Sequence, residues 1–259
     1  MIFFVAFFGL IFGSFLNVLI YRLPNHESIV LPASHCPNCQ HKLAWYDNIP
    51  VISYLLLGGK CRYCKKPISP RYLIVELVNG GLWALSFGIF GLNSLMVLSC
   101  IFCSICLVIT FIDLEHMIIP DSMNIGILIV AFVQIFLPNR LGNASLSITW
   151  QDQLFGFGFG IGFLLLMVLI EKVFKKEVMG GGDLKMIAAV GLFLGWQLTI
   201  LGIMLASIIG SLIEGVLRIA KLRAKNEPLP FGPYLVIGFL TSLFVGADLI
   251  NWYLNLFKF

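Results

Sequence analysis

Apolar positions occur along this chain in eight runs that are divided by shorter polar segments. The runs cover residues 2–20, 73–92, 94–112, 122–138, 153–170, 184–197, 198–217 and 231–250. An apolar helix of about 20 residues crosses the hydrocarbon core of a bilayer, so the pattern predicts an all-α polytopic membrane protein with about eight transmembrane helices. Residues 184–217 could instead form one long run that re-enters the membrane, and we place the break between two helices at Gly195-Trp196-Gln197.

The overall composition supports a membrane protein. The chain has 259 residues, of which 59% are hydrophobic, and its mean hydropathy is +0.96. One soluble core could not bury so much apolar surface. The first run lacks a cleavage site of the small-x-small kind, and Gly9, Gly13, Ser14 and Asn17 are typical of a helix-packing face. We therefore expect a retained transmembrane helix and not a removed signal peptide.

Lysine and arginine are distributed unevenly between the polar segments. Three segments, residues 21–72, 171–185 and 218–230, hold 15 of the 17 basic residues, while Arg140 and Lys258 fall on the other face. The 15 are Arg22, Lys42, Lys60, Arg62, Lys65, Lys66, Arg71, Lys172, Lys175, Lys176, Lys185, Arg218, Lys221, Arg223 and Lys225. Basic loops stay in the cytoplasm, so we place these segments inside and the N-terminus and C-terminus outside. No nucleic-acid-binding motif accompanies the net charge of +4, which we interpret as an orientation signal in the lipid bilayer.

Two aspartates lie at the ends of apolar runs, where a charge is costly and indicates function. In this topology Asp113 ends the third run and Asp183 begins the sixth, so both reach the cytoplasmic interface although 70 residues separate them. Two carboxyl groups in contact share one proton, because like charges do not both ionise there. The pair is therefore a candidate hydrolytic dyad. The alternative for Asp183 is a structural role, the capping of a helix by an acidic side chain.

The string Gly180-Gly181-Gly182 directly precedes Asp183. Glycines expose the backbone and would let an extended peptide approach the carboxyl group closely. Peptide hydrolysis suits a pair of acids, since one carboxylate activates water while its protonated partner polarises the carbonyl. The pair titrates as a unit, and the sequence leaves the two roles interchangeable.

Four cysteines in the segment 21–72 form two C-x-x-C pairs with 21 residues between the pairs. They are Cys36, Cys39, Cys61 and Cys64. This spacing is typical of a tetrahedral zinc site that joins two turns into a small ribbon. The competing interpretation is a redox pair, which a cytoplasmic location disfavours. His35 and His41 flank the first pair and could replace a sulfur ligand. We expect a small zinc-ribbon-like loop domain between the first and second helices.

Two stretches around the aspartates follow a known pattern. They are Phe111-Ile112-Asp113-Leu114-Glu115-His116-Met117-Ile118-Ile119-Pro120-Asp121 and Gly180-Gly181-Gly182-Asp183-Leu184-Lys185. These residues resemble the type IV prepilin peptidase family, the GxGD membrane aspartyl proteases. Near the N-terminus, Gly13-Ser14-Phe15-Leu16-Asn17-Val18 and Tyr21-Arg22-Leu23-Pro24 are similar to the opening segment of that family. The resemblance implies that Asp113 and Asp183 are the catalytic pair.

The resemblance also implies a substrate and a second activity. Type IV prepilins or pseudopilins would lose their short basic leader after a glycine, at the cytoplasmic face of the bacterial inner membrane. Methylation of the new N-terminal residue with S-adenosylmethionine would follow, because family members with methyltransferase activity often carry the four-cysteine arrangement on the same loop. The candidate cofactor-binding residues are Gly59, Lys60, Arg71 and Glu76. The lysine or arginine could pair with the carboxylate of the cofactor, and Glu76 could hold its amine or ribose. Alternatively, Lys60 and Arg71 are topology charges and Glu76 pairs with one of them.

We divide the chain into three parts. Residues 1–20 form the first transmembrane helix, residues 21–72 the cytoplasmic four-cysteine loop domain, and residues 73–259 a seven-helix membrane aspartyl protease domain. Two other functions fit parts of the pattern. A proton-coupled transporter would use the buried aspartates as a relay, and a membrane thiol oxidoreductase would use the C-x-x-C pairs. Nothing in the pattern indicates an oligomeric state.

Overall fold

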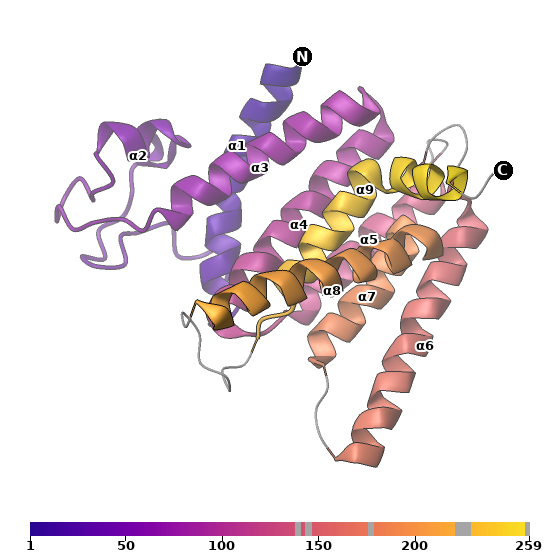
Figure 1. Ribbon diagram of the computed structural model, residues 1–259. Coiled ribbons are helices and arrows are strands. Elements are labelled where there is room, and N and C mark those ends of the chain that lie inside the picture. The colour runs from indigo at the N-terminus through magenta and orange to yellow at the C-terminus, as the bar shows by residue number, and fades with distance from the viewer. Residues whose placement is uncertain (138–140, 143–146, 176–178, 221–228, 257–259) are drawn as a thin grey trace. The chain divides into compact units, whose positions relative to one another are not determined.

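Helices account for the regular structure of the protein (Figure 1). The computed structural model describes residues 1–137, 141–142, 147–175, 179–220 and 229–256. The elements in these residues are α1 (Ile2–Arg22), the 3-10 helix η1 (Trp45–Asn48), α2 (Ile52–Leu56), α3 (Arg71–Phe90), α4 (Ser94–His116), α5 (Asp121–Ile135), α6 (Trp150–Phe174), α7 (Gly181–Leu194), α8 (Trp196–Ile219) and α9 (Gly232–Asn255). The predicted all-helical class is confirmed.

Each of the eight predicted apolar runs corresponds to one helix, α1 and α3 to α9. Six of them, α1, α3, α4, α6, α8 and α9, are long and apolar enough to cross a membrane. The other two, α5 and α7, have 15 and 14 residues. At 1.5 Å per residue they reach only about 22 Å, less than a hydrocarbon core of about 30 Å. The described residues therefore contain six candidate spans, two fewer than the apolar pattern predicts.

The charge pattern that orients the chain is only partly covered by the described residues. Outside them lie Arg140, Lys176, Lys221, Arg223, Lys225 and Lys258. The seven basic residues of the segment 21–72 are all described; Arg22 ends α1, Arg71 begins α3, and the other five lie between these helices. The placement of the loops inside and of the chain ends outside stays a prediction.

The break between α7 and α8 is shorter than the three-residue turn expected at this position. It consists of Gly195, whose φ of 80° is easily adopted by glycine alone. Trp196 and Gln197 already belong to α8, and their side-chain nitrogens donate hydrogen bonds of 3.2 and 3.3 Å to Asp152 Oδ1 in the first turn of α6. This acceptor fixes the first residues of α8, so one glycine is enough to separate the two helices.

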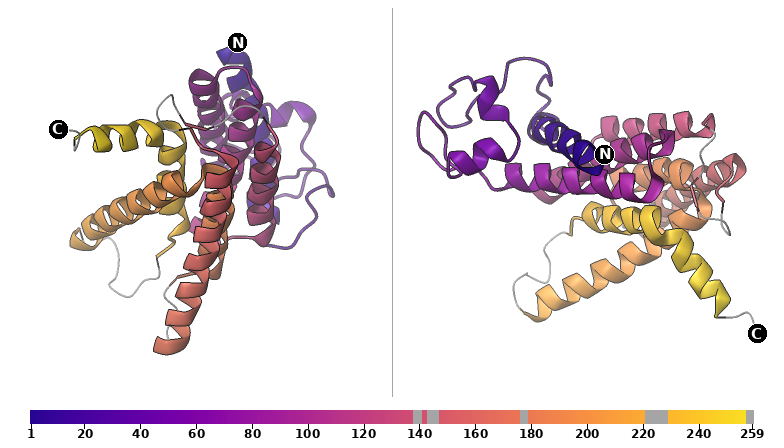
Figure 2. Two further views of the ribbon diagram at one scale, coloured as in Figure 1. Left: turned by 90° about the vertical axis from the view of Figure 1, so that its right-hand side faces the viewer. Right: turned by 90° about the horizontal axis from the view of Figure 1, so that it is seen from above.

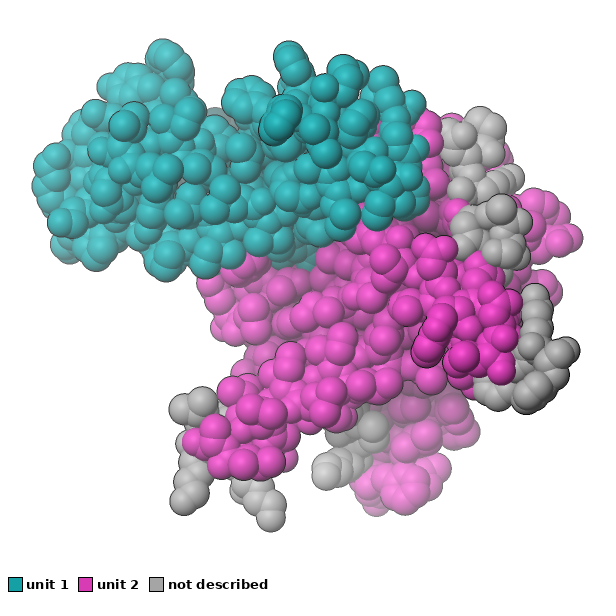
Figure 3. Space-filling view, turned by 45° about the horizontal axis from the view of Figure 1, so that its top comes forward, with its two compact units in different colours: residues 1–92, 99–108 teal, residues 93–98, 109–259 magenta. Residues whose placement is uncertain are grey.

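The chain divides into two compact units (Figure 3). Unit 1 consists of residues 1–92 and 99–108, and unit 2 of residues 93–98 and 109–259. The middle of α4 belongs to unit 1 and its two ends belong to unit 2. The four cysteines are in unit 1, and both aspartates of interest are in unit 2.

In unit 1, α1 and α3 pack with their backbones in close contact. A Cβ atom on Gly9 would lie 2.9 Å from the Cα of Gly80, and one on Gly13 would lie 2.8 Å from the Cα of Glu76. Asn79 on α3 donates a hydrogen bond of 2.7 Å to the carbonyl of Gly9. Small residues permit such an approach of two apolar helices, and these contacts agree with the packing face expected for the first helix.

In unit 2, α6 packs on α7 through glycines. Cβ atoms on Gly156 and Gly160 would collide with the backbone of Gly191 and Ala188 respectively. Gly158, between them, has open space around its Cβ position. The spacing of four residues thus marks the face of α6 that contacts α7. Helices α8 and α9 also lie side by side (Figures 1 and 2).

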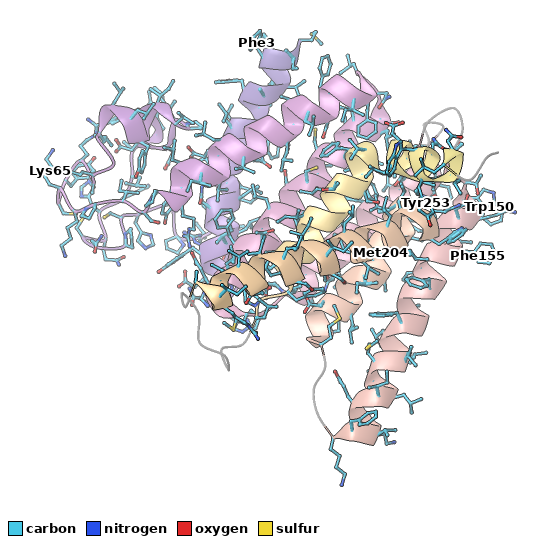
Figure 4. The ribbon with its side chains drawn as sticks, in the orientation of Figure 1. Phe3, Lys65, Trp150, Phe155, Met204 and Tyr253 are labelled. Atoms are coloured by element: carbon cyan, nitrogen blue, oxygen red, sulfur yellow. The ribbon has the colours of Figure 1, made fainter. Side chains whose placement is uncertain are left out.

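Large apolar side chains project from several of the long helices (Figure 4). Phe3 of α1 is 86% exposed and Phe155 of α6 is 69% exposed. Met204 of α8 and Tyr253 of α9 are exposed as well. Apolar surface of this extent is unfavourable in water, and it suits helices that are surrounded by lipid.

Candidate functional site

Asp113 lies in the last turn of α4, four residues before the left-handed Met117 that ends the helix. Its side chain is buried, with an exposed fraction of 5%. The backbone N–H of Gly232, the first residue of α9, donates a hydrogen bond of 3.0 Å to Asp113 Oδ2. A buried carboxyl group needs such a donor, because an unpaired one would lose its hydration without replacement.

Asp183 is the third residue of α7. The glycine string before it is part of this helix start, since Gly180 is the N-cap of α7 and the next two glycines belong to its first turn. A Cβ atom on Gly182 would lie 2.8 Å from the Cβ of Ile119. The glycine therefore leaves room for a neighbouring chain segment, and the string is a tightly packed helix start.

The first turn of α5 holds this helix start in place. Asn124, which is buried, donates a hydrogen bond of 3.3 Å from Nδ2 to the carbonyl of Gly182. Asp121, the first residue of α5, pairs with Lys185 at 2.7 Å. Both of these charged side chains are exposed, so the pair contributes little stability and mainly links two polar helix ends. Pro120 is the N-cap of α5, so the helix begins directly after it.

Asp113 and Asp183 both lie at helix ends within unit 2. Asp183 Oδ1 is buried and has no hydrogen-bond partner among the described residues. This oxygen therefore caps no backbone amide, although Asp183 lies in the first turn of α7. Asp113 is buried and Asp183 is half-buried, and two carboxyl groups in contact would share one proton. Such a pair can activate a water molecule and protonate a leaving group.

The four cysteines of unit 1 come together. The Sγ atoms of all four lie within 4.8 Å of one another. The two C-x-x-C segments form turns of the same kind. The backbone amide of the first cysteine of each pair, Cys36 or Cys61, donates a hydrogen bond to the carbonyl of His41 or Lys66. The backbone amide of Gln40 or Lys65, each with a φ near 60°, donates a hydrogen bond to the carbonyl of the same cysteine.

The geometry of this cluster fits a tetrahedral metal. Zinc–sulfur bonds of about 2.3 Å place neighbouring sulfurs roughly 3.8 Å apart, and the Sγ atoms of Cys36 and Cys64 are 3.9 Å apart. The backbone amides of Cys64 and, less strongly, Tyr63 lower the pKa of the Cys61 thiol to about 7, against the opposing effect of its burial. The thiolate is the form that binds a metal.

The histidines beside the first cysteine pair are not members of this cluster. The ring of His41 lies against that of Tyr63, with centroids 3.6 Å apart. His35 Nδ1 lies 3.2 Å from the carbonyl oxygen of Ala33. In the described residues the group with metal-ligand geometry consists of the four cysteines alone.

The residues expected to bind a methyl donor have contacts within unit 1. Glu76 is buried and accepts a hydrogen bond of 2.7 Å from the amide of Val51. Gly59 has a φ of 67° and lies against the ring of Tyr54. Lys60 is exposed, and Arg71 begins α3. The contact of Glu76 with Val51 attaches the four-cysteine segment to α3.

Two residues of the site have no counterpart in the sequence interpretation, Gly232 and Asn124. Gly232 lies in Phe231-Gly232-Pro233 at the start of the last apolar run, where a glycine beside a proline is an ordinary helix-start signal. Asn124 stands one turn after Pro120 on a run that reads as apolar. A buried amide in an apolar run is a signal for an interhelical hydrogen bond.

The fold and the site define a polytopic helical membrane protein with two acids at helix ends of one unit and a four-cysteine cluster in the other. Two family models match the chain. Residues 7–90 match the bacterial peptidase A24 N-terminal domain, and residues 100–214 match the type IV leader peptidase family. The chain belongs to the type IV leader peptidase family and is an aspartic peptidase of that family.

Curated relatives cover nearly the whole chain. A protein named prepilin leader peptidase/N-methyltransferase from Myxococcus xanthus (strain DK1622) is 38% identical over 88% of this chain and 69% of its own length. Proteins of the same name from Pseudomonas aeruginosa and Aeromonas hydrophila are both 33% identical, over 95% and 98% of this chain and 91% and 93% of theirs. No solved structure shows a significant match. Membership of a peptidase family decides against the transporter and the thiol oxidoreductase.

Proposed function

We propose that this protein removes the basic leader of type IV prepilins or pseudopilins after a glycine, with Asp113 and Asp183 as its catalytic pair. The substrate class comes from the names of the relatives. One observation supports the pair most directly. Asp183 Oδ1 is a buried acceptor with no hydrogen-bond partner among the described residues, and Asp113 is a second, buried acid at a helix end of the same unit.

The proposed reaction uses the two carboxyl groups in complementary states. The ionised one takes a proton from a water molecule, and the water oxygen attacks the carbonyl carbon of the scissile bond. The protonated one donates a hydrogen bond to the carbonyl oxygen, and the leaving nitrogen then receives a proton as the C–N bond breaks. Asp113 and Asp183 each lie at a helix end in unit 2, and either of them can serve as the base.

Substrate cleavage is tested directly with a prepilin in membranes. Membranes that contain the protein, or the Asp113→Ala or Asp183→Ala variant, are incubated with a prepilin, and the mass of its N-terminus is measured. We expect cleavage after glycine by the unchanged protein and none by either variant, with normal amounts of inserted protein. Cleavage by either variant at a rate close to that of the unchanged protein would disprove the role of the pair.

Orientation and domain organisation form a further part of the proposal. The N- and C-termini lie outside the cytoplasm, and the four-cysteine segment and both aspartates lie at the cytoplasmic side of the bacterial inner membrane. Residues 1–20, 21–72 and 73–259 act as first helix, loop domain and peptidase domain. This arrangement requires α5 and α7 to cross the membrane within the bundle. The burial of 10 of the 14 residues of α7, and the exposed apolar side chains of α5, favour this.

Zinc is the metal that we assign to Cys36, Cys39, Cys61 and Cys64. The four sulfur donors and their mutual distances fit a structural tetrahedral site. A bound zinc ion would crosslink the two cysteine turns and so stabilise a segment with little apolar core. The segment is also attached to α3 without a metal, by the hydrogen bond from the amide of Val51 to Glu76.

Methylation of the new N-terminal residue is the second proposed activity, and S-adenosylmethionine is its proposed methyl donor. The names of the relatives support it. The residues that we assign to the donor are Gly59, Lys60, Arg71 and Glu76, and Glu76 also accepts a hydrogen bond from the amide of Val51. Labelled S-adenosylmethionine in the prepilin assay tests this activity. Transfer of label to the mature N-terminus is expected, and a cleaved but unlabelled product would refute it.

A further inference from the structure

The start of α9 is directed at Asp113. Gly232 is its first residue, and its amide nitrogen lies 3.0 Å from Asp113 Oδ2, although 119 residues separate the two along the chain. Both residues are buried. Helix N-termini carry a partial positive charge on their free amide groups, so the hydrogen bond joins the positive end of a 24-residue helix to a buried carboxyl group.

The sequence of this helix start concentrates the interaction in one amide. The second residue, Pro233, has no N–H group. The amides of the next two residues, Tyr234 and Leu235, both donate to the carbonyl of Phe231 at 3.1 Å. Among the first four residues of α9, Gly232 thus supplies the amide that reaches outside the helix.

A side chain at position 232 is incompatible with this contact. A Cβ atom there would lie 2.7 Å from Asp113 Oδ2 and 3.1 Å from its Cγ. Real Cβ atoms do not approach an oxygen that closely. Position 232 does not have the positive φ that favours glycine at other positions of the chain, such as Gly195. The glycine is therefore needed for space and not for its backbone conformation.

We infer that Gly232 is a positioning residue for the peptidase reaction. Its amide fixes one oxygen of the Asp113 carboxyl group, and its missing side chain lets the helix start come within hydrogen-bond distance. The inference rests on the proposed role of Asp113 in peptide hydrolysis. With one oxygen held, the carboxyl group has a defined rotation, and its second oxygen has a defined direction for a water molecule or for the partner acid. Misplacement of a reacting group by about 1 Å costs about a hundredfold in rate.

The first test is Gly232→Ala in the full-length protein, assayed on a prepilin in membranes. We expect kcat to fall by about a hundredfold while KM changes by less than about twofold, since leader binding is not altered. Gly202→Ala is the matched control. A Cβ atom on Gly202 collides with Phe239 and so disturbs the contact of α8 with α9 without touching Asp113. Gly215→Ala, which has open space, controls for alanine itself.

The second test removes the donor without adding an atom. In cell-free translation, glycolic acid can be incorporated at position 232, so that an ester replaces the amide N–H. We expect a fall in kcat of at least about tenfold, the effect of losing one hydrogen bond to a charged group. The same ester at Gly238, inside α9, removes a hydrogen bond within the helix and is expected to retain kcat. This variant decides the matter if Gly232→Ala fails to insert.

The outcomes separate this inference from the proposed function. An active Asp113→Ala variant would disprove the catalytic pair and the inference with it. If Asp113→Ala is inactive but the ester variant retains full kcat, the pair stands and the positioning role of Gly232 is wrong. A loss of kcat in Gly202→Ala as large as that in Gly232→Ala would likewise overturn the inference, because general disturbance of α9 would then explain both.

Discussion

Asn124 and Gly182 are joined by a hydrogen bond of 3.3 Å, from the side-chain Nδ2 of Asn124 to the backbone carbonyl oxygen of Gly182. The bond connects α5 to the residue directly before Asp183. Asn124 has an exposed fraction of 4%, so water does not compete strongly for its amide. The first turns of α5 and α7 therefore hold the second acid from one side, while the contact of Gly182 with Ile119 fixes the same peptide by packing.

Replacing this amide should impair catalysis. We expect Asn124→Ala to lower kcat by about tenfold and the free energy of unfolding by about 1–2 kcal/mol, because the carbonyl of Gly182 loses its buried donor. Steady-state cleavage of a prepilin and thermal unfolding in detergent measure the two effects. Ser122→Ala, at an exposed position of the same helix start, is the control and should change neither. An Asn124→Ala variant with normal kcat would show that packing alone holds Gly182.

The acids should behave as one unit in mutants. Asp113→Asn and Asp183→Asn conserve the shape of the side chains, and each should reduce kcat by at least about 10⁴-fold. The double variant should be no slower than either single one, because loss of one member already removes the function of both. The background rate of leader cleavage in membranes without the enzyme sets the smallest kcat that can be measured for these variants. Multiplicative losses would argue for two independent roles.

Removal of two sulfur ligands should release the metal. For Cys36→Ser combined with Cys61→Ser, we expect the zinc content of purified protein to fall from about one ion per chain to near zero, since a structural site needs four ligands. Elemental analysis measures this content, and limited proteolysis should show faster cleavage between α1 and α3. Cys100→Ala, a buried position on α4, should keep its zinc. A wild-type protein without metal would contradict the assignment.

The contact of α6 with α7 gives a test of packing alone. Gly160→Ala should lower the free energy of unfolding by about 1–3 kcal/mol, because the added methyl group meets the backbone of Ala188. Gly158→Ala, two residues earlier and facing open space, should be neutral or slightly stabilising. Thermal unfolding in one detergent compares them. Equal melting temperatures would mean that α6 and α7 are less tightly packed than the structure shows.

Apolar periodicity predicts the position of all eight long apolar helices, because each run must hide its backbone polar groups in a helix. It predicts their ends less well. The run 122–138 extends beyond the end of α5 at Ile135, and the run 184–197 extends beyond the end of α7 at Leu194, where Gly195 breaks the helix. Hydropathy adds up apolar residues and does not reveal where a local conformation ends the helix.

The sequence also predicts some features of the candidate site better than others. The cysteine spacing predicts a cluster, and the structure brings the four sulfurs together, because ligands close in sequence define a metal site locally. The bond from Gly232 to Asp113 spans 119 residues and leaves no local signature. The glycine string looks flexible in the sequence, yet it is packed against Ile119. Contacts between distant segments decide these features.

Asn17 on α1 donates a hydrogen bond of 3.2 Å to the carbonyl of Tyr72 on α3, close to where the four-cysteine segment leaves and rejoins the helices. The two ends of that segment are thus tethered by the packed helix pair, independently of any metal. Packing of α1 on α3 therefore already brings the loop ends together, so that metal binding does not have to supply most of the entropy of loop closure. Loss of zinc should consequently loosen only the intervening stretch, and readdition of the ion should restore it reversibly without renewed insertion into the bilayer.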